Sequence, residues 1–591
     1  MKEMAKKTYS KKGDAIVQLN YKAIDAGKDA IEEVAVDNSW SDLTVTATRS
    51  TTGDEHFDEF VSVINSLDGY DLPVSAFMDK LDGSMKSGVA IKEKRAIATE
   101  VPRWNKDNCI QCNNCVMVCP HATIRAFLLD EEEMANLPEN IGDDVLVPMG
   151  KDMGGLVYRI QVSPDNCVGC GLCVTECPGK KGEKALEMVS VKDELVHAPL
   201  ADYMYANVKY RDDKYPLTTA KGVGFMRPYF EVSGACGGCG ETPYYRLASQ
   251  LFGKDMMIAN ATGCSSIYSG STPSTPCAID GNGQGPAWAN SLFEDNAEFG
   301  FGMKLAENYK VGHLLRIIEE NKDACEPELK ALLEEYVEIN GDRAKERELV
   351  PQIMTAVKAS SNEAIKELLN HEGDMVSKSQ WIIGGDGWAY DIGYGGLDHV
   401  IASNQNVNIL VLDTEVYSNT GGQSSKSSQA GSIAKFTAGG KSAAKKDLAQ
   451  IAMAYGHVYV AQVAMGANPV QTIKAFKEAE AYNGPSLIIA YSPCMEHGIK
   501  GGLANHQRQQ KDAVSCGYFN LLRYDPRLED AGKNPLQVDS KAPDFDKFKD
   551  FLLSENRFAQ LLKVNPEHAE ALMEKCLADA KKRRLRLDRM A

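Results

Sequence analysis

The sequence lacks any run of about 18 apolar residues, the length that a membrane-spanning helix requires, so no membrane span is predicted. It also lacks an excess of positive charge, because it contains 65 Lys and Arg residues but 82 Asp and Glu residues, which gives a formal net charge of −17. A chain this acidic is a poor candidate for binding nucleic acid or anionic lipid. The first twenty residues contain no apolar segment of the kind found in secretory signals.

What is present is the composition of a globular protein, with 43% hydrophobic and 25% charged residues. A chain of 591 residues is too long for one hydrophobic core, and it predicts about three or four domains. We expect four segments: the tail of an α/β domain over 1–50, a connector over 51–95, a cysteine-dense domain over 96–208 and a Gly-rich α/β domain over 209–591.

The sequence predicts particular strands and helices in the first and the last of these segments. In the first, residues 15–27 are interpreted as a short strand running into a helix and residues 32–36 as a second strand. That is too little to close a sheet, so the beginning of this domain is expected on another polypeptide. In the last segment, leucines and isoleucines recur at helical spacing over 303–375 and predict a buried helical stripe.

The 16 cysteines carry the strongest chemical signal, because closely spaced cysteines in a long chain without a secretion signal bind metal more often than they form disulfides. Half of them form an internal repeat in which the pattern C-x-x-C-x-x-C-x-x-x-C-P occurs twice. The members of the repeat are Cys109, Cys112, Cys115 and Cys119, and then Cys167, Cys170, Cys173 and Cys177.

This repeat is typical of a pair of ferredoxin-type [4Fe–4S] clusters. The first three cysteines of each repeat cap one cluster from a tight loop, and the fourth is carried away to bind the other cluster. One predicted ligand set is therefore Cys109, Cys112, Cys115 and Cys177, and the other is Cys167, Cys170, Cys173 and Cys119. Zinc is the alternative, but structural zinc sites usually use two separated pairs of ligands, not runs of four that end in Cys-Pro.

A third site is predicted from four distant cysteines. Cys236 and Cys239 lie on a Gly-rich loop, whereas Cys264 and Cys494 each follow a probable strand. Because the carboxyl ends of parallel strands converge on the ligand crevice, these thiols could meet. Spacing favours a cluster there and leaves zinc or no metal open. Glu241 would lie beside this site, unless it is an ordinary solvated or core-paired glutamate.

The remaining cysteines have no partner pattern and are expected to be inert thiols. They are Cys277, Cys325, Cys516 and Cys576.

A βαβ unit is predicted around the Gly-Asp-Gly motif that contains Asp386. A buried strand over 381–384 precedes the motif, and a helix and a second apolar strand over 407–413 follow it. The two strands of a βαβ unit should be parallel, with a right-handed connection, so Asp386 and Thr414 both project from strand ends onto one crevice. The glycines allow close approach of a diphosphate, and Asp386, Thr414 and a nearby carbonyl offer oxygen ligands for Mg²⁺. A lone Gly-Asp-Gly is typical of a turn, but these flanking elements resemble a thiamine-diphosphate signature, with Thr414 where many such enzymes have Asn.

Several longer strings make the chain resemble the C-terminal half of pyruvate:ferredoxin (flavodoxin) oxidoreductase, within the 2-oxoacid:acceptor oxidoreductase family. The strings are VPRW at 101–104, GACGGCGETP at 234–243, TGCSS at 262–266, GDGWAYDIGYGG at 385–396 and DTEVYSNTGG at 413–422. The resemblance runs essentially from end to end. It implies an α/β fold, in which a thiamine-diphosphate-binding parallel-sheet domain is preceded by a ferredoxin-like domain with two [4Fe–4S] clusters.

The resemblance also implies specific ligands. It implies a third [4Fe–4S] cluster on Cys236, Cys239, Cys264 and Cys494. It implies Mg²⁺ on Asp386, Thr414 and the Val416 carbonyl, and a substrate-facing, catalytic role for Asn419. The residues that would line thiamine diphosphate are Glu241, Cys264, Gly385, Asp386, Gly387, Trp388, Thr414, Glu415, Val416, Tyr417, Ser418 and Asn419.

The implied activity is oxidative decarboxylation of pyruvate with coenzyme A to acetyl-CoA and CO₂. Electrons would pass through three clusters to ferredoxin or flavodoxin, in an oxygen-poor cytoplasm. In this family the catalytic glutamate, the pyruvate-binding side chains and most of the coenzyme A surface belong to the N-terminal half. The chain is therefore expected to need that half, as a separate chain or a missing segment, within a dimer of the complete enzyme. Oxidation of another 2-oxoacid and a purely electron-transferring role are the alternatives.

Overall fold

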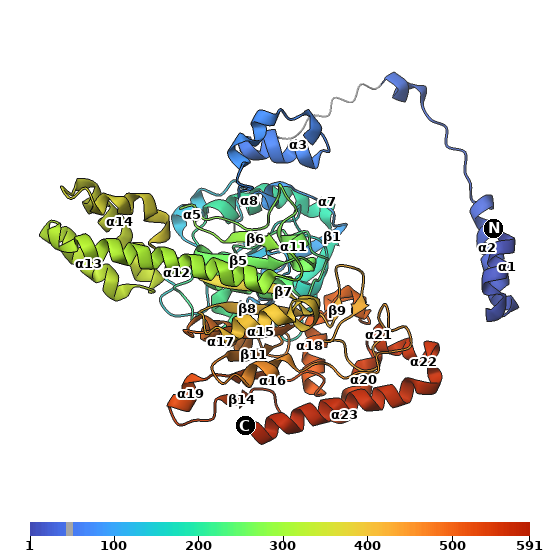
Figure 1. Ribbon diagram of the computed structural model, residues 1–591. Helices are drawn as coiled ribbons and strands as arrows, with labels where there is room; N and C mark the ends of the chain where they lie inside the picture. The colour runs from blue at the N-terminus through green and yellow to red at the C-terminus, as the bar shows by residue number, and fades with distance from the viewer. Residues whose placement is uncertain (43–50, 143) are drawn as a thin grey trace. The chain divides into compact units, whose positions relative to one another are not determined.

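The computed structural model describes residues 1–42, 51–142 and 144–591, and the chain forms two compact units, Met1–Asp58 and Glu59–Ala591 (Figure 1). In the first unit, α1 (Lys2–Tyr9) and α2 (Asp14–Asp29) are joined by a short 3₁₀ turn and by an ion pair between Lys2 and Asp25 at 2.6 Å.

The two strands predicted in this unit are wrong. Residues 14–29 form one helix, and residues 31–37 have no regular secondary structure. The physical reason lies in the spacing of the apolar residues, because Val17, Tyr21 and Ile24 recur at a helical period, not at the alternation of a strand.

The cysteine-dense part of the second unit contains two small antiparallel sheets. One pairs β1 (Glu100–Trp104) with β4 (Leu186–Ser190), and the other pairs β2 (Ile124–Leu129) with β3 (Val157–Val162). Both pairings join one segment beside the first cysteine repeat to one beside the second, so they hold the two repeats together. The short helices in and around the repeats are α4 (Asn114–Val118), α5 (Glu131–Ala135), α6 (Leu172–Thr175), α7 (Val191–Glu194), α8 (Ala198–Asn207) and α9 (Ala220–Val223).

An eight-stranded sheet organises the rest of this unit, with strand order β14-β13-β11-β12-β8-β7-β5-β6. The strands from β11 to β6 in this order are parallel, and β13 and β14 are antiparallel to their neighbours. Their bounds are β5 (Met256–Ala261), β6 (Ala287–Ser291), β7 (Ser379–Gly385), β8 (Asn408–Asp413), β11 (Tyr459–Val463), β12 (Ser486–Tyr491), β13 (Leu522–Tyr524) and β14 (Leu536–Val538). The arrangement confirms the predicted α/β class.

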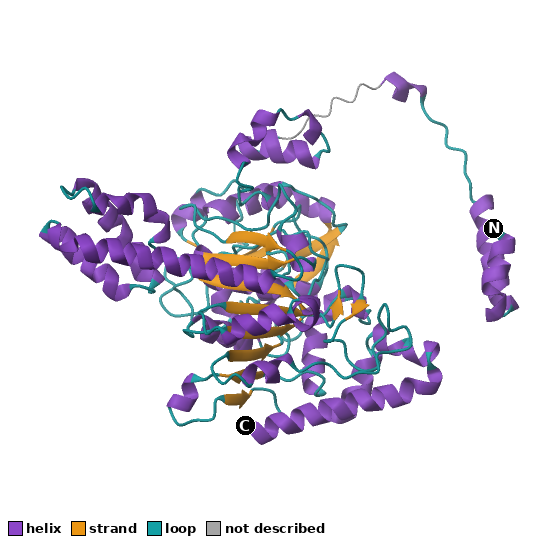
Figure 2. Ribbon diagram, viewed as in Figure 1, coloured by secondary structure: helices purple, strands orange, loops and turns teal. Residues whose placement is uncertain are grey.

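Helices cover both faces of this sheet (Figure 2). Ile383 of β7 packs in a core that includes α10 (Thr242–Phe252) and α17 (Pro469–Glu480). The adjacent Ile382 packs in a separate core that includes α15 (Tyr394–Ala402) and α16 (Leu448–Met453). A strand buried on both faces requires apolar residues at consecutive positions, which explains the unbroken apolar runs of β7, β8 and β12.

A group of helices, here called the helical arm, extends from this sheet (Figure 1). It consists of α12 (Asn296–Asn321), α13 (Pro327–Ile339), α14 (Arg343–Ala359) and the 3₁₀ helix η11 (Ile365–Asp374). The predicted helical stripe is confirmed, because the arm has a hydrophobic core of its own. Its buried side chains include Leu314, Ile318, Leu333, Tyr336, Ile353 and Leu368.

The remaining α-helices and strands all belong to the second unit. They are α3 (Ser62–Asn65), α11 (Cys264–Ser269), β9 (Val416–Tyr417), β10 (Gln423–Ser424), α18 (His506–Ser515), α19 (Arg527–Asp530), α20 (Phe548–Leu553), α21 (Asn556–Ala559), α22 (Leu561–Val564) and α23 (Pro566–Met590). Of the helices in the described part of the chain, none combines the length and apolar character needed to cross a lipid bilayer.

Candidate functional site

The eight tandem cysteines gather in two groups of thiols, each drawn from both repeats. The first group is Cys109, Cys112, Cys115 and Cys177, and the second is Cys167, Cys170, Cys173 and Cys119. Burial raises the pKa of Cys115, and the three other thiols of its group raise it further. Burial also raises the pKa of Cys173, with Cys119 as the strongest neighbouring contribution. Cys177 thus lies beside the thiols of the first repeat and Cys119 beside those of the second, as the spacing predicts, and the division of the thiols between two clusters stays a prediction.

The two cysteine loops have the same backbone conformation. The residue before the second cysteine, Gln111 or Gly169, has a φ of +55° or +67°, and the residue after it, Asn113 or Gly171, has a φ of +59° or +72°. In each loop the backbone N–H two residues after the first cysteine donates to that cysteine's Sγ over 3.4 Å. A positive φ is uncommon outside glycine, so Gln111 and Asn113 adopt in the first loop a conformation that glycines adopt in the second. N–H donors aimed at sulfur also suit thiolates, the form in which cysteine binds metal.

The four distant cysteines converge on one pocket of about 180 Å³ at the carboxyl edge of the sheet. Cys264 begins α11 shortly after β5, Cys494 follows β12, and Cys236 and Cys239 lie on the loop before α10. Each of the 16 cysteines is a free thiol, so no disulfide uses these groups. Four thiols around a shared cavity suit a cluster that binds thiolates. The structure therefore brings together the third predicted ligand set.

Ser418 and Asn419 complete the wall of this pocket on the side of β8. The Ser418 hydroxyl donates to Cys264 Sγ over 3.2 Å. Burial, with a further contribution from Glu241, raises the pKa of Cys264 to about 12. A free thiol in this position stays protonated, so a bound metal would have to supply the positive charge that a thiolate needs.

Glu241 lines the same pocket and is buried, with 4% of its surface exposed. Its Oε2 atom has no hydrogen-bond partner among the described residues. Burial raises the pKa of this carboxyl from 4.5 to about 7. The structure therefore excludes the solvated-glutamate alternative and leaves a carboxyl oxygen available to a ligand in the pocket.

The burial of Glu241 predicts that this residue destabilises the folded, cofactor-free chain increasingly as the pH rises. In the unfolded chain the carboxyl ionises near pH 4.5, whereas in the folded chain it stays protonated up to about pH 7. The folded state therefore loses stability as the pH rises between these values. Urea denaturation at pH 5 and pH 8 should show wild type losing roughly 2–3 kcal/mol more than Glu241→Gln, which cannot ionise. An equal loss in both proteins would contradict the assignment.

The predicted magnesium ligands are in mutual contact. The Thr414 hydroxyl donates to Asp386 Oδ1 over 3.0 Å and lies 3.0 Å from the Val416 carbonyl oxygen. The Ser425 hydroxyl donates to the second oxygen of Asp386 over 2.5 Å. Burial and the nearby Asp413 raise the pKa of Asp386 well above its ordinary value. A bound divalent cation would favour the ionised form of this carboxyl, and clustered oxygen donors are what Mg²⁺ prefers.

Parallel register explains why these oxygens meet. Gly385 of β7 pairs with Leu412 of β8, and Asp413 pairs with Tyr491 of β12. The three strands therefore end together, and Asp386 and Thr414 are the first residues beyond two of them.

The other predicted residues of the motif have distinct surroundings. A Cβ atom on Gly385 would meet only the Leu412 carbonyl at 3.9 Å, so this backbone faces open space. A Cβ atom on Gly387 would lie 2.6 Å from the Tyr417 ring, so glycine is required where these two segments cross. Trp388 is fully buried, and its indole N–H has no partner among the described residues. Gly385 fits a diphosphate-facing role, whereas Trp388 packs inside the domain.

Sequence reasoning missed a buried ion network around Glu415. The carboxylate of Glu415 lies 3.0 Å from Lys445 Nζ and 2.9 Å from an Arg557 nitrogen, and it accepts a hydrogen bond from Tyr518. Lys445 also lies 2.6 Å from Asp413. Burial opposes ionisation of Glu415, but Lys445 and Arg557 outweigh it and lower its pKa.

This network fixes the turn after β8, where Glu415 has a φ of +60°. Its carboxylate is engaged by these cations, and Glu415 does not line the pocket of the four thiols. His497 supports the same turn, because its Nε2 lies 2.7 Å from the Thr414 carbonyl oxygen. No local motif marks Lys445, Tyr518, Arg557 or His497, so only the fold reveals their contribution.

Comparison with known proteins places these features in context. The model of the 4Fe-4S dicluster domain matches residues 108–181, and that of the C-terminal TPP binding domain of thiamine pyrophosphate enzymes matches residues 359–490. These matches confirm the predicted ferredoxin-like domain followed by a thiamine-diphosphate-binding domain.

Curated relatives match nearly the whole chain. It is 48% identical over 597 residues to a pyruvate:ferredoxin oxidoreductase of Moorella thermoacetica. That alignment covers 99% of this chain and 50% of the relative. It is 45% identical over 601 residues to a pyruvate-flavodoxin oxidoreductase of Klebsiella pneumoniae. That alignment covers 100% of this chain and 50% of the relative. The chain thus spans about half the length of these relatives, and the predicted resemblance is confirmed.

Proposed function

We propose that this chain, a homologue of the C-terminal half of pyruvate:ferredoxin and pyruvate-flavodoxin oxidoreductases, is the cofactor-bearing part of a pyruvate-oxidising enzyme. With an N-terminal half, this enzyme would convert pyruvate and coenzyme A to acetyl-CoA and CO₂. It would transfer the electrons through three [4Fe–4S] clusters to ferredoxin or flavodoxin, and it would act as a dimer.

One observation carries this proposal, and it concerns Thr414. The hydroxyl of Thr414 belongs to the oxygen group around Asp386, and Thr414 also lines the pocket of the four thiols. The candidate diphosphate–metal site and the candidate cluster site therefore share a residue. Such proximity suits a reaction in which electrons leave the substrate for a nearby acceptor.

Specific groups of this chain would bind the cofactors. Asp386, the Thr414 hydroxyl and the Val416 carbonyl would hold Mg²⁺ on the diphosphate, with the backbone of Gly385 facing that diphosphate. When bound, thiamine diphosphate supplies an electron sink for decarboxylation, and [4Fe–4S] clusters accept single electrons. His497 and the Glu415 network would keep the turn after β8 rigid, so that the Mg²⁺ ligands stay in place.

The residues that line the pocket would bind the third cluster and contact the substrate. Cys236, Cys239, Cys264 and Cys494 would bind the third cluster, and the Ser418 hydroxyl would stabilise the thiolate of Cys264 through its hydrogen bond. Asn419, on the pocket wall, would face the substrate. The tandem groups would form the route by which electrons leave.

The test pairs the cluster-loaded chain with a separately produced N-terminal half of a relative. The chain alone should bind thiamine diphosphate in a Mg²⁺-dependent way but should not reduce ferredoxin with pyruvate. Addition of the N-terminal half should start pyruvate- and coenzyme A-dependent reduction of ferredoxin or flavodoxin. Faster turnover of a different 2-oxoacid would overturn the choice of pyruvate. Failure of the assembled pair to bind thiamine diphosphate would leave only the electron-transferring alternative.

A further inference from the structure

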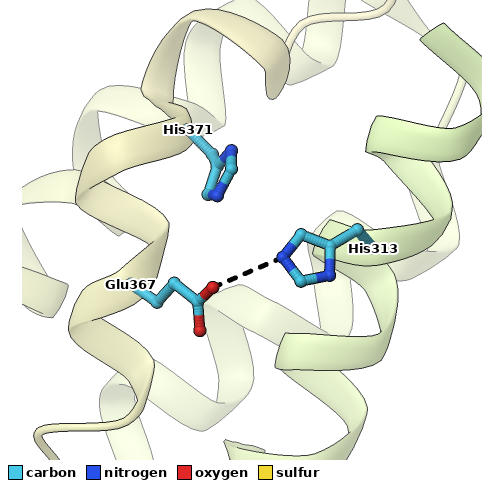
Figure 3. A group of neighbouring side chains, drawn as sticks. All are labelled: His313, Glu367 and His371. Atoms are coloured by element: carbon cyan, nitrogen blue, oxygen red, sulfur yellow. Dashed lines mark hydrogen bonds and ion pairs between the residues drawn. The ribbon is translucent and has the colours of Figure 1, made fainter. Parts of the chain in front are cut away.

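Three potential metal ligands lie together in the helical arm, separate from the sheet that carries the site described above. His313 comes from α12, and Glu367 and His371 come from η11 (Figure 3). One ligand atom from each residue lies within 4.8 Å of the other two. His313 Nε2 is 3.3 Å from a carboxylate oxygen of Glu367, and the two imidazole rings are 5.4 Å apart.

We propose that His313, Glu367 and His371 bind a divalent transition-metal ion of the zinc class. Two imidazoles and a carboxylate suit zinc and its neighbours, whereas Mg²⁺ and Ca²⁺ prefer sites made of oxygen alone. Bond lengths near 2.0–2.2 Å would draw the three ligand atoms closer together than they lie here. Small side-chain rotations supply that movement, because the three residues are partly exposed.

A metal ion at this site would link α12 to η11, two elements that are distant in sequence. The side chains of α12 and η11 already meet in the core of the arm, where Leu314 of α12 and Leu368 of η11 are buried. A metal bridge from His313 to Glu367 and His371 would join the same two elements at the surface. The carboxylate of Asp374, which pairs with Lys310 at 2.9 Å, lies 3.7 Å from His371 Nδ1 and adds negative charge beside the site.

Arg316 opposes metal binding and therefore provides a sharp test. Its guanidinium nitrogen lies 2.8 Å from His313 Nδ1, and as a donor it leaves the ring proton on Nε2, which faces Glu367. A metal on Nε2 requires that proton on Nδ1 instead, so the contact with Arg316 must break. Arg316 also places a positive charge beside the ion. Removal of this side chain should therefore strengthen metal binding.

The test is equilibrium dialysis of the cluster-loaded chain against Zn²⁺, with the bound metal quantified. One zinc per chain should bind beyond any held by cysteines. Its affinity should fall at least about tenfold in His313→Ala and in His371→Ala, and rise severalfold in Arg316→Gln. His568→Ala, an exposed histidine on α23, serves as the matched control and should bind zinc as wild type does.

Two results would overturn the proposal. One is equal zinc affinity in wild type, His313→Ala and His371→Ala. The other is an Arg316→Gln variant that binds zinc no more tightly than wild type. The gain expected in Arg316→Gln cannot arise from damage to the fold, so it separates a metal site from a structural role of the histidines. The proposal does not depend on the proposed pyruvate activity.

Discussion

Replacement of Asp386 by alanine is expected to weaken Mg²⁺-dependent thiamine diphosphate binding by at least about a hundredfold, equivalent to roughly 3 kcal/mol. Among the three candidate Mg²⁺ ligands, Asp386 alone has a charge, because Thr414 contributes a hydroxyl and Val416 a carbonyl. Turnover in the pair with the N-terminal half should fall accordingly. The measurement is calorimetric titration of the cluster-loaded chain with thiamine diphosphate at fixed Mg²⁺.

Two further variants separate loss of charge from loss of structure. Asp386→Asn retains the volume and an oxygen that can accept from Thr414, yet it should lose nearly as much affinity as the alanine variant. Asp398→Asn changes a carboxylate on α15 that pairs with Tyr394 and Tyr455, and it should bind normally. Tight binding by both Asp386 variants would mean that this carboxylate is not the metal ligand.

Replacement of Cys494 by serine is expected to remove about four of the irons per chain and to abolish transfer of electrons from pyruvate to the acceptor. Cys494 supplies one of the four thiols around the pocket, and a cubane that lacks one ligand is readily lost. The two tandem clusters should remain, because their ligands lie in another domain. Iron and acid-labile sulfide analysis of the anaerobically purified variant measures the change.

Cys516→Ser is the matched control for this loss. Cys516 is a buried free thiol too far from the pocket to line it: it packs in a separate hydrophobic core, and its Sγ donates to the Ala513 carbonyl. It should retain the full iron content. Full iron content in Cys494→Ser, or loss of iron in Cys516→Ser, would show that the third ligand set is misassigned.

Part of this site was predictable from rules of spacing and strand order, whereas the roles of Val416 and Asn419 were implied by the family resemblance. The strand–helix–strand order predicted that β7 and β8 are parallel, and their parallel register places Asp386 beside Thr414. The same rule predicted that Cys264 and Cys494, each beyond a strand end, would meet.

The parts that sequence could not predict depend on long-range packing. Glu415 meets Arg557 from far along the chain, and no periodicity or spacing marks that pair. The metal-ligand group of the helical arm is similar, because two α-helices, α13 and α14, lie between His313 and Glu367 in the sequence. The wrong strand predictions near the N-terminus arose from short apolar runs, whose period is ambiguous over a few residues.

The central claim is that this chain by itself provides the ligands for three [4Fe–4S] clusters. Its most direct test is iron and acid-labile sulfide analysis of the anaerobically purified chain, with EPR after reduction. The account predicts about twelve irons per chain and the signals of interacting [4Fe–4S] clusters. About eight irons per chain, both with and without the N-terminal half, would contradict it.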